Sequence, residues 1–290
     1  MAAVLYAALS GALFGALAVA VRQALRSGAD RDLGAVVVPG VALVVALLVS
    51  VPSLAHDTIR FADLWPFALA GVLAPGASQV LFIIAVRDAG PSRTSILIGT
   101  APLMSVGIAL ALLNEPLRPL LLVGTALVVA GGVALARERS RPEQFRVLGV
   151  AFALACAALF AVRDNVVRWA ARGAHPPPLV ATDVSLAAAT AFMLAYLLAF
   201  RRGGIRNGVR HSVLAFAPAG IALAVAYDCL LEAFDSGRVS IVAPLNATQS
   251  LWAVLFSALL YGRQAELIGR RLVVAGALIV AGAAVIGAVR

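Results

Sequence analysis

The sequence has no lysine and only three histidines and two cysteines among its 290 residues. Cys156 and Cys229 stand alone in separate apolar runs. Their positions exclude a disulfide framework or a cysteine metal motif, so we interpret both as small helix residues. The histidines (His56, His175 and His211) are scattered, and the sequence has no nucleophile elbow, P-loop or HExxH motif. Nothing therefore indicates an ATP-driven pump, a metal site or an enzyme, and we expect no cofactor.

Charge is also scarce: 13% of the residues are charged, against about 25% in an average soluble domain. Hydrophobic residues make up 62% of the chain, and its mean hydropathy is +0.98. The net charge is +9, every cation is an arginine, and nearly all of the arginines lie in short gaps between apolar runs. That distribution is typical of a membrane protein rather than of a nucleic-acid-binding face. The start of the chain carries no cation, so we expect the first apolar run to remain as a membrane span rather than to be cleaved.

Roughly 20 apolar residues cross the hydrocarbon core of a bilayer. The sequence predicts ten such spans, which fit an all-α integral membrane protein. They cover residues 3–22, 34–52, 64–86, 92–113, 117–136, 147–168, 178–200, 212–234, 239–261 and 268–289. The loops between them are short, and none is long enough for a soluble domain.

The two halves of the chain, 1–140 and 141–290, repeat. Ala12-Leu13-Phe14 recurs as Ala158-Leu159-Phe160, and an arginine follows each phenylalanine at the same spacing. Each half holds an odd number of spans, so the two copies must have opposite orientations. We therefore predict two inverted five-helix repeats, an arrangement found in alternating-access carriers.

The arginines also predict an orientation. The loops after odd-numbered spans hold 16 of the 23 arginines, whereas the other loops and the termini hold six. The positive-inside rule places the richer side in the cytoplasm. We expect a multi-pass protein of the plasma membrane (the bacterial inner membrane) with both termini extracytoplasmic.

A run of motifs in the first half identifies a family resemblance. It comprises Gly90, the mid-span Pro102, Asn114-Glu115-Pro116, Gly124 and Gly131-Gly132. With these motifs the chain, over nearly its whole length, resembles the EamA-type transporters of the drug/metabolite transporter (DMT) superfamily. In the second half the proline comes early, at Pro244, and the glutamate is displaced to Glu266. The resemblance implies ten spans, inverted repeats and export of small metabolites, but it does not identify a substrate.

The sixth span contains three consecutive polar residues, Arg163, Asp164 and Asn165, where the first repeat has Leu17-Ala18-Val19. One interpretation is a helix end, with Arg163 reaching the headgroups and Asp164 paired to Arg168. The other is a polar patch on a transport path, with Arg163 facing a substrate carboxylate or a fixed acid.

The eighth span carries Tyr227, Asp228 and Glu232, with the two acids on one helix face. Burial in a low-dielectric cavity favours the protonated form of a carboxylate, so Asp228 is our candidate proton-coupling residue. The alternative is a static Arg163–Asp228 ion pair that locks two helices.

Tyr6, Ser10 and Phe14 form a stripe along the first span, and the repeat pairs Phe14 with Phe160. The stripe suits either a cavity wall or ordinary helix packing. Further candidates for cavity lining are Asn246, Gln249 and Trp252 in the ninth span, with Gln79 in the third. Their amides could equally hold helices together.

Two further features have structural interpretations. Glu115 and Glu266 lie at helix starts, where a carboxylate is favourable. Prolines within spans, including Pro75 and Pro244, are candidate hinges. The Gly11-xxx-Gly15 pair and the glycines of the fifth and tenth spans could join the two halves or two protomers of a homodimer.

These features together predict a secondary transporter, an exporter of small metabolites such as amino acids, with proton coupling as an option. Its partners would be a small-molecule substrate and the lipid bilayer, with no nucleic acid. The first alternative is a flippase for lipids or lipid-linked substrates, which would need a lateral opening. A membrane-embedded enzyme is the weaker alternative.

Overall fold

The computed structural model describes residues 1–56, 60–89, 94, 97–136, 147–173, 176–200, 208–261 and 270–288. These residues form helices and contain no strand. Seven of the helical segments are long and apolar enough to cross a membrane, and three shorter apolar helices cover 101–112, 119–134 and 274–286. The all-helical membrane fold predicted from the sequence is therefore confirmed at this level. The predicted loop at 137–146 and Glu266 lie outside the described residues.

The helices follow the predicted apolar runs closely. In the first half they are α1 (Ala2–Arg26), α2 (Arg31–His56), α3 (Trp65–Gly71), α4 (Ser78–Ala89), α6 (Ala101–Leu112) and α7 (Pro119–Ala136), with short turns η1 (Phe61–Asp63) and η2 (Val72–Ala77). In the second half they are α8 (Val147–Gly173), α9 (Pro178–Phe200), α10 (Val209–Ser236), α11 (Val239–Asn246), α12 (Gln249–Tyr261) and α13 (Arg270–Ala288). A helix suits these runs because lipid offers the backbone no hydrogen-bonding partners.

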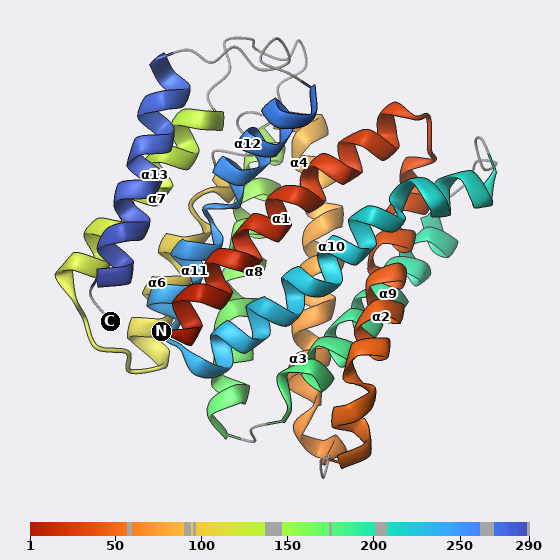
Figure 1. Cartoon of the computed structure of the whole chain (residues 1–290), viewed down its shortest axis with the longest axis horizontal. Coiled ribbons are helices and arrows are strands. Elements are labelled where there is room, and N and C mark those ends of the chain that lie inside the picture. The colour runs from red at the N-terminus through yellow and green to blue at the C-terminus, as the bar shows by residue number, and fades with distance from the viewer. Residues whose placement is uncertain are drawn as a thin grey trace.

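The two halves interleave, because their main packing contacts are with each other (Figure 1). Helix α1 packs along α10 and α12, whereas α8 packs along α4 and α6. Helices α2 and α9 contact each other, and so do α7 and α13 at one edge of the molecule. Exchanging the two halves converts the α1 pairings into the α8 pairings, and it leaves the α2–α9 and α7–α13 pairings unchanged.

Two of the apolar segments are interrupted. Between α3 and α4, Ala74 has an extended backbone (φ −151°, ψ 122°) and Pro75 follows it. The proline explains the break, because it lacks an N–H and disfavours a helical conformation in the residue before it. Between α11 and α12 the helix is interrupted at residues 247 and 248. Each break frees backbone groups that must find partners elsewhere.

Thr100 and Thr248 form the same local turn in the two halves. Each hydroxyl donates to the carbonyl three residues earlier, Leu97 at 2.6 Å and Leu245 at 2.7 Å. Each threonine carbonyl then accepts the N–H groups of the residues three and four positions later. The sequence repeat therefore has a counterpart in the bonding of the backbone.

The glycines singled out in the sequence lie where helices of the two halves touch. A Cβ atom at Gly131 would lie 2.7 Å from the Ala275 carbonyl oxygen, and one at Gly282 would lie 2.6 Å from the Gly124 carbonyl oxygen. A Cβ at Gly15 would lie 2.6 Å from the Cβ of Trp252. These glycines therefore join the two halves within one chain, which was one of the two open interpretations.

We predict that Gly131→Ala lowers the stability of the folded protein by about 1–3 kcal/mol, the usual cost of forcing extra volume into a packed core. The added methyl would collide with the backbone of α13, which cannot rotate away. The measurement is thermal unfolding in detergent. Gly107→Ala in α6 is the matched control, because no atom lies within 4 Å of a Cβ at that position. An equal loss in both variants would contradict the account of the α7–α13 contact.

Candidate functional site

Helix α8 brings Arg163, Asp164 and Asn165 into the protein interior. Their exposed fractions are 5%, 7% and 5%, respectively. Arg163 lies about 15 Å along the helix from its end at Gly173, at a rise of about 1.5 Å per residue. A guanidinium this deeply buried, this far from the end of its helix, does not extend to the membrane surface.

The guanidinium of Arg163 is held between two aromatic rings and one carboxylate. Its Cζ atom lies 5.8 Å from the ring centroid of Phe160 and 5.6 Å from that of Tyr227. Its Nε atom lies 3.1 Å from Oδ1 of Asp164. Cation–π contact and ion pairing both offset the cost of removing the cation from water.

Neither of the alternative ion pairs considered from the sequence is formed. Arg163 pairs with Asp164 and not with Asp228. Arg168, the other proposed partner of Asp164, instead donates from Nη1 to the carbonyl oxygens of Phe234 and Asp235, at 2.7 Å each. It therefore stabilises the C-terminal end of α10, where helix carbonyls lack partners.

Ser105 in α6 completes the polar group on the other side. Its hydroxyl donates to Oδ2 of Asp164 at 2.9 Å. The amide of Asn165 donates to the carbonyls of Ser105 at 3.0 Å and Ala161 at 2.8 Å. Sequence reasoning missed Ser105, although a hydroxyl in an apolar span one turn after Pro102 was a usable signal.

The two helix breaks meet α10 at adjacent residues. The hydroxyl of Tyr227 donates to the free carbonyl of Ala74 at 2.6 Å. Ser10 in α1 donates to the carbonyl of Ala226 at 2.8 Å and lies 3.2 Å from Oδ1 of Asn246, the last residue of α11. The polar residues predicted in the first, eighth and ninth spans are thus gathered around the middle of α10.

The group around Arg163 has unused hydrogen-bonding capacity. Four atoms of the group are buried and form no hydrogen bond: Nε and Nη1 of Arg163, Oδ1 of Asp164 and Oδ1 of Asn165. Buried polar atoms without partners are rare in native proteins and call for an explanation. Nη1 of Arg163, a cationic donor that takes no part in the ion pair with Asp164, matches a ligand that carries a negatively charged oxygen.

The other predicted lining residues fall into two groups. Tyr6 and Phe14 are partly buried against the hydrophobic core, and Trp252 stacks on Phe256 with centroids 5.7 Å apart. Gln79 and Gln249 are exposed, so the structure does not bring their amides to the buried polar group.

Asp228 and Glu232 lie on a different side of α10 from Tyr227. Asp228 is near Thr182 and Asp183 of α9, and Glu232 is close to Asp228. The sequence analysis did not single out Asp183. No group of histidine, cysteine, aspartate and glutamate within the described ranges could hold a metal ion.

The placement of Glu115 corrects an expectation. Its two carboxylate oxygens accept the backbone N–H groups of Val239 at 2.8 Å and Ser240 at 3.0 Å. It therefore caps the start of α11, in the other half of the chain, rather than the helix that follows it. Arg172 lies 3.6 Å from the same carboxylate and donates to the Leu113 carbonyl at 2.7 Å. Sequence position could not reveal this partner, since it lies more than 120 residues away.

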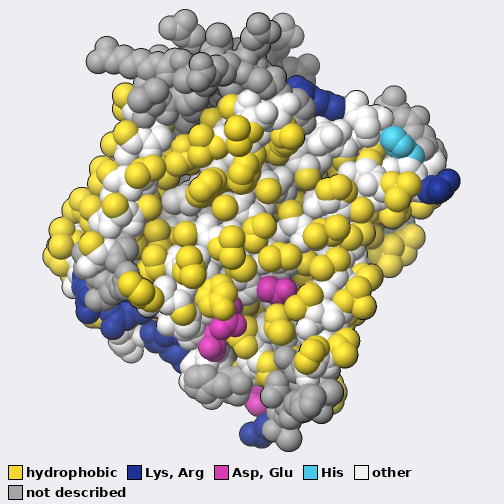
Figure 2. Space-filling model, in the orientation of Figure 1, with side chains coloured by type: hydrophobic (Ala, Val, Ile, Leu, Met, Phe, Trp, Pro, Cys, Tyr) yellow, Lys and Arg dark blue, Asp and Glu magenta, His cyan; other side chains and the backbone are white. Residues whose placement is uncertain are grey.

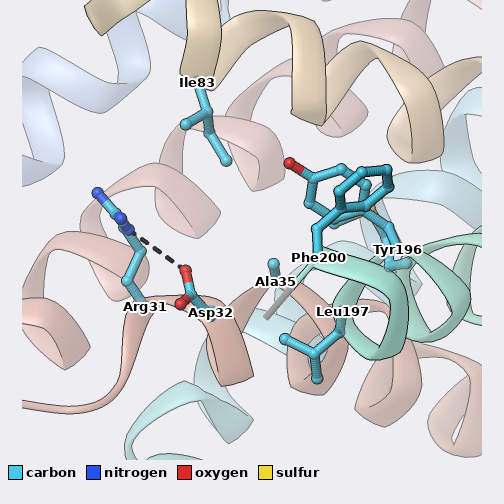
Figure 3. A pocket seen from close by; sticks show the side chains of 8 residues that line it. Arg31, Asp32, Ala35, Ile83, Tyr196, Leu197 and Phe200 are labelled. Carbon is cyan, nitrogen blue, oxygen red and sulfur yellow. Dashed lines mark ion pairs between the residues drawn. The ribbon is translucent and has the colours of Figure 1, made fainter. Parts of the chain in front are cut away.

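An open cavity of about 130 Å³ lies at the other end of the molecule, between the start of α2, Ile83 of α4 and the end of α9 (Figure 3). Its lining is Arg31, Asp32, Ala35, Ile83, Met193, Tyr196, Leu197 and Phe200. Arg31 and Asp32 form an ion pair at 3.6 Å beside apolar and aromatic side chains. The cavity is amphipathic, and the sequence did not predict it.

The surface agrees with a bilayer environment. Figure 2 shows a face covered mainly by hydrophobic side chains, with arginines towards its edges. The described residues, which are helical and carry such a surface, define a multi-pass membrane protein.

Comparison with known proteins agrees with this assignment. The profile of the EamA-like transporter family matches residues 1–137 and again residues 147–288. The chain therefore belongs to the EamA-like transporter family, as its motifs indicated. One solved crystal structure shares the fold, with a TM-score of 0.80 and 22% identity over 98% of this chain and 95% of the other. No curated protein sequence matches the chain.

We predict that Glu115→Gln lowers the thermal stability of the protein, because it leaves the start of α11 without an anionic cap. The expected cost is about 1.5–3 kcal/mol, the range for a hydrogen bond to a charged group. Asp32→Asn is the control, since its ion pair is exposed and such pairs contribute about 0–1 kcal/mol. Equal unfolding temperatures for Glu115→Gln and the unmodified protein would show that the cap is not important for stability.

Proposed function

We propose that this protein is a secondary transporter that exports small carboxylate-bearing metabolites, such as amino acids, by alternating access. The family and the fold support membrane transport. The observation that supports the substrate class is the buried Nη1 of Arg163, a cationic donor without a hydrogen-bond partner deep in the membrane.

Arg163 can bind a substrate without releasing Asp164. A guanidinium has five N–H donors in a planar fork, and its Nε faces Asp164 while Nη1 is free. A substrate carboxylate at Nη1 would be held by a charge-assisted hydrogen bond, which is stronger than a neutral one. Apolar parts of the substrate would contact the rings of Phe160 and Tyr227, which already flank the cation.

The proposed architecture has ten spans in two inverted five-helix repeats, residues 1–140 and 141–290. Three observations support it. The family profile matches each half separately. The packing pairs α1–α10 and α8–α4 exchange when the halves are exchanged. The turns at Thr100 and Thr248 have the same hydrogen bonds. In such carriers one repeat moves against the other around a central site.

The network around Glu115 supports alternating access as well. It ties the loop after α6, the end of α8 and the start of α11 together at one end of the molecule. At the opposite end the cavity between α2, α4 and α9 is open. We propose that opening of the Glu115 end requires these contacts to separate, and that this end faces the extracytoplasmic side.

A lipid or lipid-linked substrate flippase is the alternative, and one observation favours it. The amphipathic cavity at Arg31 has an exposed cation beside the aromatic pair Tyr196 and Phe200, whose centroids are 5.0 Å apart. A headgroup could contact Arg31 while an acyl chain lies against the rings. Binding that depended on Arg31 and not on Arg163 would support this alternative.

The substrate class predicts a specific pattern of ligand stabilisation. A carboxylate metabolite should raise the unfolding temperature of the purified protein, and its methyl ester should not. Arg163→Gln should abolish the effect, because it removes the cationic donor. Arg210→Gln, an exposed arginine at the start of α10, should leave it unchanged. Stabilisation of Arg163→Gln equal to that of the unmodified protein would refute the proposed role of Arg163.

The proposed orientation predicts that reporter tags at either terminus lie outside the cytoplasm. A C-terminal alkaline phosphatase fusion should be active and a C-terminal green fluorescent protein should be dark, because each folds on one side only. The reverse pattern would invert the orientation that the arginines suggest.

A further inference from the structure

A second polar group lies beside the Arg163 group, on the other side of α10. Tyr227 faces Arg163, and Asp228, the next residue, faces α9. Successive helix residues point about 100° apart, at about 3.6 residues per turn. Any change at Asp228 therefore acts on the same helix turn that contacts the proposed substrate site.

Asp183 is the innermost acid of this second group. It lies in α9 and is 6% exposed. Its Oδ2 accepts a hydrogen bond from the hydroxyl of Ser50 in α2, which leaves Oδ1 buried with no partner. The Asp183 carboxylate therefore has one oxygen held by a hydrogen bond and one oxygen available to bind a proton.

The carboxylate of Asp228, beside Thr182, also has an oxygen atom without a hydrogen bond. The Thr182 hydroxyl is fully buried and interacts with the Asp228 carboxylate. Oδ1 of Asp228 is buried and has no hydrogen-bond partner. Glu232 lies one turn further along α10 and is partly exposed. Its negative charge is close enough to interact electrostatically with Asp228. Glu232 and Asp228 are thus both partly exposed, whereas Asp183 is buried.

No described cation neutralises this group. The groups that face Asp183 and Asp228 are Ser50 from α2, Thr182 from α9, and Cys229 and Glu232 from α10. On the α8 side, Arg163 is paired with Asp164, and Arg168 lies next to Asp235 and Glu115. Figure 2 shows acidic side chains on a face that is otherwise hydrophobic, over the C-terminal half of α10. Unpaired carboxylates are too costly in that environment, so a cation must accompany them.

We propose that Asp183 and Asp228 share one transported proton, which reaches them through Glu232, and that this pair couples transport to the proton gradient. The inference rests on the proposed transport function and deepens it. A proton suits the site better than a metal ion, because no metal-binding arrangement of acids is present among the described side chains. Two carboxylates in one low-dielectric site cannot both ionise readily, so the pair retains a proton.

The transfer balances as a simple relay. A hydronium ion from the outside solution protonates the Glu232 carboxylate and leaves as water. The O–H bond on Glu232 then breaks as one forms on Oδ1 of Asp228, and the proton is shared with the Asp183 carboxylate. The acids lie near the end of α10 that we propose to be extracytoplasmic. A proton taken up there and released to the cytoplasm would drive export of substrate in the opposite direction.

The test combines infrared difference spectroscopy of the purified protein with transport in proteoliposomes. In the unmodified protein, a shift from acidic to alkaline buffer should remove the carbonyl band of a protonated carboxylic acid. Asp183→Asn and Asp228→Asn should each lose that band and the proton-gradient dependence of transport, while substrate exchange without a gradient persists. Asp228→Glu should retain both, because it keeps a protonatable group. Asp63→Asn, in the η1 turn far from α9 and α10 in sequence and paired with Arg60, is the control and should match the unmodified protein.

The outcomes separate this inference from the proposed function. If substrate moves but the band survives both asparagine substitutions, the proton site is wrong. If the band behaves as expected and no solute moves, the transport proposal fails and the proton site stands. A band that moves when sodium replaces choline in the buffer would assign the site to a metal cation and overturn the proton.

Discussion

A cation buried within a membrane-spanning helix is the constraint on which this structure depends. Arg163 cannot lose its charge under ordinary conditions, so its surroundings must supply compensation. Asp164 supplies one negative charge, and the rings of Phe160 and Tyr227 supply two aromatic faces. Asp164 is in turn held by Ser105 from the first half. The compensation therefore requires both halves of the chain to be assembled around α8.

Helix α10 connects this centre to the rest of the fold. Tyr227 closes over Arg163 and at the same time binds the carbonyl that the break at Ala74 leaves free. Its neighbour Ala226 accepts from Ser10 of α1, which also reaches the end of α11. Asp228 faces the acidic group on α9. A movement of this one helix turn would change the arginine site, both helix breaks and the acidic pair together, which is what coupled transport needs.

The sequence was most informative where the physical signal is local. Apolar runs predicted the helices, Pro75 marked a real interruption, and the unusual Arg163-Asp164-Asn165 insertion identified the buried polar group. It was least informative where partners are distant. Glu115 looked like a cap for its own helix but caps α11, because an N-terminal helix end accepts any carboxylate that the fold brings to it. Ser50 and Asp183 lie 133 residues apart, and neither is unusual until α2 and α9 pack together.

For polar residues within the spans, side-chain type was a weak guide to burial. The amides of Gln79 and Gln249 in apolar spans suggested a cavity lining, and both of these are exposed. The buried contacts are made by Ser10, which the sequence suggested, and by Ser105, which it did not. A serine hydroxyl changes the mean hydropathy of a span only slightly, but it is small enough to lie where two helices pack closely.

The most direct test of the central claim is a structure of the protein with a stabilising carboxylate metabolite bound. The account predicts a ligand carboxylate within hydrogen-bonding distance of Nη1 of Arg163, beside Tyr227 and Phe160, with the Arg163–Asp164 pair retained. A ligand bound elsewhere, with the environment of Nη1 unchanged, would contradict it.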